Sequence, residues 1–152
     1  MQASKTEISP GEVKRRDGWE VALHDWAAGM IGQPFVLGQT NCAMLAMAAL
    51  DVMYSTGLFD RFKHVATDEE SEVAESMARR TLHEIEALGL RRVTKFYEQT
   101  GDIILGYREP FERCGVYLGS SRVLTSDRVR GVCVADLDFF FRAYKARGFR
   151  WG

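Results

Sequence analysis

The feature that most constrains the fold is the run Cys42–Tyr54, CAMLAMAALDVMY, which is apolar on nearly every side. Alanine, leucine and methionine favour helix, and Gly57 provides a stop soon after the run. A helix that is apolar all round must be covered by other elements on most of its faces. The sequence therefore predicts a central, buried helix that begins at Cys42, just after the capping residues Thr40 and Asn41.

Two further helical patterns flank this central one. From Trp19 to Met30 the apolar residues recur at helical spacing, and Gly32 and Pro34 end the pattern. A third stripe covers residues 73–88 and stops at Gly89. We therefore expect three helices in the first half of the chain.

After Gly89 the spacing of the apolar residues changes from a helical pattern to one typical of extended strands. Short runs rich in β-branched and aromatic residues, separated by turn residues, predict an antiparallel meander of three to four strands, and they lie at 101–106, 114–118, 122–125 and 131–134. Asp136 is placed to cap a closing helix, Leu137–Arg147. Because the predicted helices precede the predicted strands along the sequence, we expect an α+β domain over residues 18–152. Residues 1–17 are polar and are expected to form a flexible N-terminal arm.

Composition excludes several classes of partner. The net charge is −1, from 20 Lys and Arg against 21 Asp and Glu, so we expect no nucleic-acid partner. No apolar run approaches the roughly 18 residues that span a bilayer, so no membrane span is expected. The first twenty residues hold charged side chains where a signal peptide needs an apolar stretch, which predicts synthesis in a cytoplasm.

Cys42 occupies a reactive position. Free N–H groups and the helix dipole at the first turn of a helix stabilise a thiolate, which is the nucleophilic form of cysteine. The preceding residues 38–41 (GQTN) offer donors for an oxyanion. The alternative interpretation is that Cys42 is a small apolar residue of a buried helix.

The three cysteines also allow a metal-site interpretation. Cys42, Cys114 and Cys133 fall on the central helix and on two predicted strands, and thiolates suit zinc or iron. A structural site usually needs four ligands, and the chain has no fourth cysteine. Packing cysteines are the favoured interpretation, so no metal and no cofactor are expected.

Three segments resemble the NlpC-like cysteine peptidases of the papain superfamily, especially the small branch encoded in phage tail gene clusters. They are residues 32–43 (GQPFVLGQTNCA), 101–105 (GDIIL) and 115–119 (GVYLG). The resemblance implies a papain/NlpC-like fold with Cys42 at the nucleophile position. It places the Asp of the family's Gly-Asp pair at Asp102, with no catalytic role assigned.

The chain departs from the family pattern at the general base. The resemblance assigns the base to the residue two before Gly115, which is Arg113, and the orienting residue to a position near Thr125. Arginine does not release its proton at ordinary pH, so Arg113 cannot act as a base. The chain's histidines, His24, His64 and His83, all precede the predicted sheet, and the spacing assigns none of them to the site.

These observations favour a structural or assembly component of a phage tail tip, built on a degenerate peptidase fold and without activity. Its expected location is the virion, and its expected partners are other tail-tip proteins. Exposed aromatic and arginine side chains concentrate binding energy in interfaces, so the interface candidates are Trp19, Trp26, Phe149, Arg150 and Trp151. The alternative is a peptidoglycan hydrolase that aids DNA entry, with Cys42 as nucleophile and the cell wall as partner.

Overall fold

The computed structural model describes residues 14–62, 86–108, 111–144 and 146–151. The helices are α1 (Trp19–Met30), α2 (Cys42–Tyr54), α3 (Leu58–Phe62) and α5 (Leu137–Ala143). The strands are β1 (Arg91–Val93), β2 (Ile103–Arg108), β3 (Phe111–Gly119), β4 (Arg122–Asp127), β5 (Gly131–Asp136) and β6 (Arg147–Arg150). The expected α+β class is confirmed. The expected helix over 73–88 falls mostly outside the described residues.

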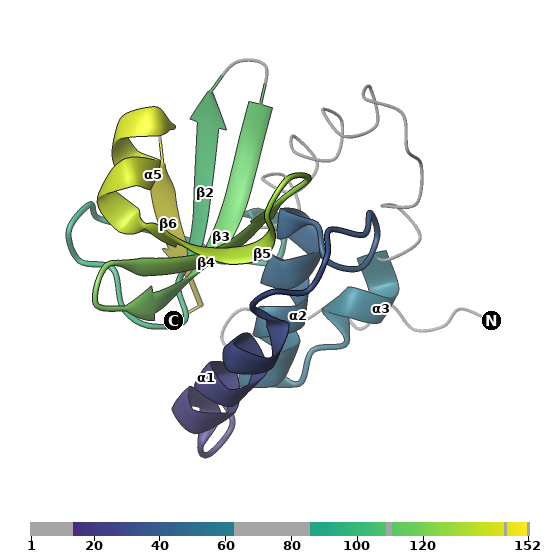
Figure 1. Ribbon diagram of the computed structural model, residues 1–152. Coiled ribbons are helices and arrows are strands. Elements are labelled where there is room, and N and C mark those ends of the chain that lie inside the picture. Colours follow the sequence, from purple (N-terminus) through teal and green to yellow (C-terminus); the bar gives the residue numbers. More distant parts are fainter. Residues whose placement is uncertain (1–13, 63–85, 109–110, 145, 152) are drawn as a thin grey trace.

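All six strands join one antiparallel sheet in the order β1-β6-β2-β3-β4-β5. The predicted meander corresponds to β2–β5, in which each strand pairs with the next along the chain. After β5 the chain crosses one face of the sheet as α5 and returns as β6, which lies between β1 and β2 (Figure 1). The closing helix therefore ends at Ala143, earlier than the expected Arg147.

Two apolar clusters form on opposite faces of the sheet. Helices α1 and α2 cover one face, where seven residues of α2 are buried, in agreement with its all-round apolar pattern. On the other face, Leu137 and Phe140 of α5 pack on Ile104 and Val123. Figure 1 shows the central strands between α2 and α5. The sheet is thus the middle layer, and Cys42 lies on its α2 side.

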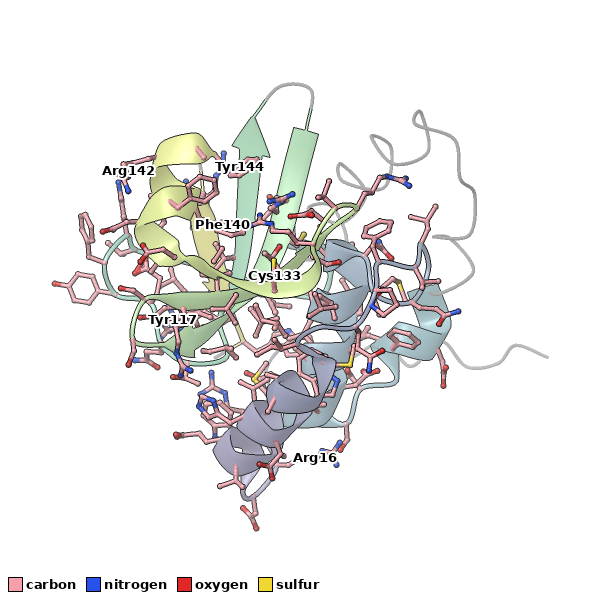
Figure 2. All side chains as sticks on the ribbon, in the orientation of Figure 1. Arg16, Tyr117, Cys133, Phe140, Arg142 and Tyr144 are labelled. Carbon is pink, nitrogen blue, oxygen red and sulfur yellow. The ribbon has the colours of Figure 1, made fainter. Side chains whose placement is uncertain are left out.

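Glycines on β2 and β3 allow two close approaches. A Cβ at Gly106 would lie 2.6 Å from Cβ of Tyr144, the residue that follows α5, and one at Gly115 would lie 2.9 Å from the carbonyl oxygen of Leu124 on β4. Figure 2 shows Phe140 and Tyr144 on the side of α5 that faces these strands. Asp136 caps α5 as expected, because its side chain accepts a hydrogen bond from the N–H of Asp138 at 2.8 Å.

The residues just before α1 are hydrogen-bonded to the C-terminal end of α2. The N–H of Arg16 donates to the carbonyl oxygen of Met53, and its guanidinium donates to that of Asp51, both at 2.8 Å. The carbonyls at a helix C-terminus lack partners within the helix and attract cations. Arg15 and Arg16, near the end of the arm predicted over residues 1–17, therefore contact α2. Residues 1–13 lie outside the described residues.

Candidate functional site

The loop before α2 is held by its own side chains. Thr40 accepts a hydrogen bond from the N–H of Val36 and donates one to the carbonyl oxygen of Pro34, both at 2.7 Å. Asn41 is the N-cap residue of α2, and its side chain accepts from the N–H of Gly38 at 2.9 Å. These contacts fix the chain direction at the entry to the helix. Cys42 is the first residue of α2, as the sequence predicts.

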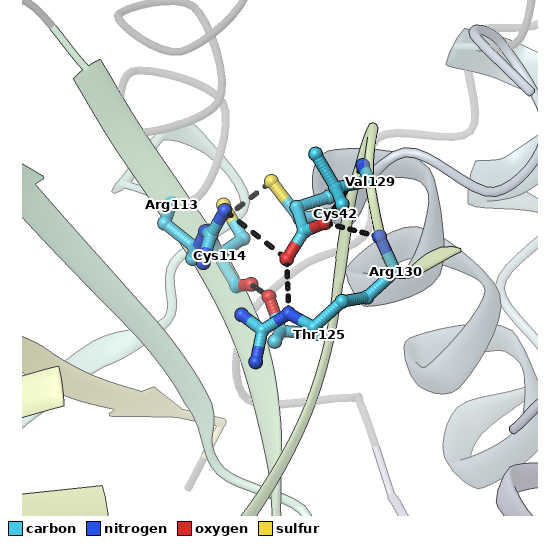
Figure 3. Close-up of polar contacts among 7 residues, drawn as sticks. Cys42, Arg113, Cys114, Thr125, Val129 and Arg130 are labelled. Atoms are coloured by element: carbon cyan, nitrogen blue, oxygen red, sulfur yellow. Dashed lines mark hydrogen bonds and ion pairs between the residues drawn. The ribbon is translucent and has the colours of Figure 1, made fainter. Parts of the chain in front are cut away.

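Helix α2 and strand β3 meet at the sulfur of Cys42. The backbone N–H of Cys114 donates to Sγ of Cys42 at 3.3 Å, although 72 positions separate the two residues (Figure 3). Cys42 is half-buried and Cys114 is buried. The sulfur of Cys42 therefore faces the strand that carries Arg113 and Cys114.

These surroundings favour the thiolate of Cys42. A hydrogen bond from the thiol of Cys114 has the largest effect, and with the N–H of Cys114 and the charge of Arg113 it lowers the pKa of Cys42 to about 7. Burial acts in the opposite direction, because it disfavours a charge. The thiolate of Cys42 is therefore accessible closer to neutral pH than that of a free cysteine.

Arg113, at the position to which the resemblance assigns the base, makes two other contacts. One guanidinium nitrogen lies 3.8 Å from Oδ2 of Asp127, and the guanidinium carbon lies 5.7 Å from the ring centroid of Tyr144, the residue after α5. Neighbouring side chains alternate between the faces of a strand, and Tyr144 belongs to the cluster on the α5 face. Arg113 therefore supplies positive charge near Cys42 while its side chain is engaged by Asp127 and Tyr144.

Asp127 is the residue of this site that the sequence analysis missed. Burial opposes its ionisation, but hydrogen bonds from the N–H and guanidinium of Arg130 and from the N–H of Val129 lower its pKa overall. The Arg130 contacts measure 2.6 and 2.8 Å. The available signal was strand alternation, because Asp127 lies two residues after Thr125 and so projects to the same face of β4.

Thr125 has a different role from the orienting residue that the resemblance implies. It is fully buried, and its hydroxyl donates to the carbonyl oxygen of Cys114 at 2.7 Å. The polar side chain that contacts Arg113 belongs to Asp127 instead. Thr125 therefore fixes the strand segment whose N–H holds the Cys42 sulfur.

The metal alternative receives no support within the described parts of the chain. No group of three or more His, Cys, Asp or Glu side chains there is placed to hold a metal ion. Cys42 and Cys114 adjoin each other, whereas Cys133 lies on β5, opposite Thr125 in the register (Figure 2). The three cysteines therefore do not form a common site.

The chain's end is part of the core, which corrects the interface assignment. Phe149 and Trp151 are only 3% and 4% exposed, and the indole N–H of Trp151 donates to the carbonyl oxygen of Leu88 at 2.7 Å. Arg150 forms an ion pair with Asp102 at 2.8 Å. Phe149 and Arg150 belong to β6, an inner strand of the sheet, and Trp151 directly follows it.

The remaining candidates lie away from the Cys42 sulfur or beyond the described residues. Trp19 and Trp26 are half-buried against the core, and the guanidinium of Arg15 lies 4.1 Å from the ring centroid of Trp19. His24 is half-buried on α1. His64 and His83 lie outside the described residues.

Asp102 makes contacts that join neighbouring segments of the sheet. Its Oδ2 accepts from the N–H of Gln99 and the guanidinium of Arg150, both at 2.8 Å. Burial raises the pKa of Asp102, and these two partners oppose that rise. The residue therefore ties β6 and the 94–100 segment to the start of β2.

The fold and site define an α+β domain with an ionisable cysteine at the start of its central helix, beside an arginine–aspartate pair. The chain belongs to the family described as "Domain of unknown function (DUF6950)", whose model matches residues 14–146. A search of curated proteins found no match. None of the described helices has the length and hydropathy needed to cross a bilayer.

Proposed function

We propose that this protein is a structural or assembly component of a bacteriophage tail tip, built on a cysteine-peptidase fold that has lost its base. The observation that carries the proposal is the engagement of Arg113 by Asp127 and Tyr144 at the position of the base. A guanidinium has donors and no acceptor, so it cannot take a proton from a nucleophile. General acid–base catalysis contributes roughly 10²–10⁴-fold to such reactions, and this site lacks its usual source.

The arrangement of elements supports the papain/NlpC-like part of the proposal. A cysteine begins the central helix, and the antiparallel strand after the Gly-Asp pair, β3, passes beside its sulfur. That strand holds the 115–119 segment on which the resemblance rests. The assignment to phage tails rests on the resemblance, and the expected partners remain neighbouring tail-tip proteins.

A second candidate function is peptidoglycan hydrolysis, favoured by the pKa of about 7 at Cys42. The thiolate is the attacking form, and it is populated at neutral pH without a base. The leaving amine would still need a proton donor, and the described residues place no histidine at the Cys42 sulfur. Peptidoglycan hydrolysis by the wild type that is lost in Cys42→Ala would separate this mechanism from the inactive scaffold.

The test is made in the phage that encodes the protein. We expect the chain in purified particles, and we expect Cys42→Ala particles to retain the protein and full infectivity. Leu45 is fully buried in α2, so Leu45→Asp should abolish folding and incorporation. Absence of the wild-type chain from particles, or lost infectivity when folded Cys42→Ala protein is incorporated, would contradict the proposal.

A further inference from the structure

Two thiols from distant parts of the sequence meet between α2 and β3. The backbone nitrogen of Cys114 lies 3.3 Å from Sγ of Cys42, and the side chain of Cys114 is the largest cause of the lowered pKa of Cys42. Neither cysteine is part of a disulfide. A packing role for either cysteine does not require this contact between α2 and β3, so the pairing needs a separate account.

The two thiols differ in access and in charge. Cys42 is half-buried, whereas Cys114 is 2% exposed. Cys42 also carries the lowered pKa, so it is the better nucleophile at neutral pH. Cys114 lies behind it, within reach of its sulfur and shielded from solvent. This is the asymmetry expected of an attacking thiol and a resolving thiol.

We propose that Cys42 and Cys114 form a peroxide-reactive dithiol that closes to an intramolecular disulfide and links the start of α2 to β3. The inference is independent of the tail-tip function, because it requires neither a catalytic base nor a partner protein. The third cysteine, Cys133, has no part in it.

The chemistry balances with hydrogen peroxide as the oxidant. The Cys42 thiolate attacks one peroxide oxygen, the O–O bond breaks, and the departing oxygen leaves as water after protonation. Cys42 is then a sulfenic acid. The Cys114 sulfur attacks the Cys42 sulfur, the S–O bond breaks, and the hydroxyl leaves as a second water with the Cys114 proton. Two thiols are oxidised to one disulfide, and one peroxide is reduced to water.

The surrounding contacts favour ring closure over further oxidation. The hydroxyl of Thr125 holds the carbonyl of Cys114 at 2.7 Å, so the segment of β3 that carries the second thiol is fixed. Positive charge from Arg113 favours the Cys42 thiolate that starts the sequence. A sulfenic acid formed at Cys42 would therefore react with the nearby thiol of Cys114.

The test treats the full chain with hydrogen peroxide and records intact mass and a non-reducing peptide map. We expect the loss of two hydrogens and a Cys42–Cys114 cross-linked peptide in the wild type and in the matched control Cys133→Ser. Cys114→Ser should instead accumulate a dimedone-trapped sulfenic acid at Cys42. Cys42→Ser should form neither product.

Other products would overturn the proposal. These are oxygen addition at Cys42 of the wild type without loss of hydrogens, a disulfide that includes Cys133, or a disulfide between two chains. If Cys42→Ser or Cys114→Ser does not fold, as judged by circular dichroism, the peptide maps of the wild type and of Cys133→Ser decide the question by themselves.

Discussion

The backbone N–H of Cys114 donates a 3.3 Å hydrogen bond to the sulfur of Cys42, which joins the first turn of α2 to β3. A main-chain donor in a sheet is held by its neighbours and cannot rotate away as a side chain can. The hydroxyl of Thr125 fixes the carbonyl of the same residue, so both main-chain polar groups of Cys114 are engaged. The reactive state of Cys42 is therefore a property of the fold.

The first prediction concerns the pH dependence of thiol reactivity. The pKa of Cys42 is lowered to about 7, so iodoacetamide should alkylate Cys42 with a midpoint near that pH. Below it the rate should fall about tenfold per pH unit, because the thiolate is the reactive form. Peptide-resolved mass spectrometry measures this rate, and a midpoint at or above the roughly 8.5 of a free cysteine would refute the account of the site.

The second prediction separates the charge of Arg113 from its shape. Arg113→Ala removes a positive charge that lowers the pKa of Cys42, so the alkylation midpoint should move to higher pH. Arg113→Lys keeps the charge and should leave the midpoint closer to that of the wild type. Equal midpoints in all three proteins would show that Arg113 does not act on the thiol.

The third prediction concerns close packing between β3 and β4. A Cβ at Gly115 would press on Cγ1 of Val123 and lie 2.9 Å from the carbonyl oxygen of Leu124. Gly115→Ala should therefore lower the free energy of unfolding by about 1–3 kcal/mol. Gly29 is the matched control, because its Cβ would meet nothing within 4 Å, and alanine there should add about 0.5–1 kcal/mol to helix α1. Urea unfolding measures both changes, and equal effects would contradict the close packing of β3 against β4.

The fourth prediction tests the place of the C-terminal residues. Trp151 is 4% exposed, its indole N–H is bonded to Leu88, and its ring meets Tyr54 edge to face at 4.7 Å. Trp151→Ala should cost about 3–5 kcal/mol of unfolding free energy, as for a large core side chain. Val129 is 94% exposed, so Val129→Ala should change stability by less than about 0.5 kcal/mol. A Trp151→Ala protein as stable as the wild type would restore the chain end as a docking candidate.

The sequence predicted the elements whose signals are local. The all-round apolar run placed α2, and the polar residues before it placed Cys42 at the helix start. Turn residues between β-branched runs predicted β2–β5. Each of these patterns is complete within a short stretch of chain, so no distant partner was needed to interpret it.

The outer part of the sheet could not be predicted in the same way. Strands β1 and β6 are three and four residues long, and they pair although more than fifty positions separate them (Arg91 with Arg150, Val93 with Gly148). Neither strand has enough length to show alternation. Phe149, Arg150 and Trp151 were therefore interpreted as interface residues.

At the candidate site, the partner of Arg113 was missed for a related reason. The family pattern pointed to Thr125, whereas the side chain that pairs with Arg113 is Asp127 at the end of β4. The β3–β4 hairpin carries Asp127 back to Arg113, and hydrogen bonds from Val129 and Arg130 in the β4–β5 turn hold its carboxylate. Residue order alone does not contain that geometry.

The most direct test of the central claim is the release of soluble fragments from purified peptidoglycan by the full chain. Wild-type protein and Cys42→Ala are compared at pH 7 to 8, where the Cys42 thiolate is populated, with Cys133→Ala as a control cysteine substitution. We expect no release above background from any of the three, because Arg113 cannot provide the base that hydrolysis needs. Release by the wild type and Cys133→Ala that disappears in Cys42→Ala would contradict the account and identify the protein as a hydrolase.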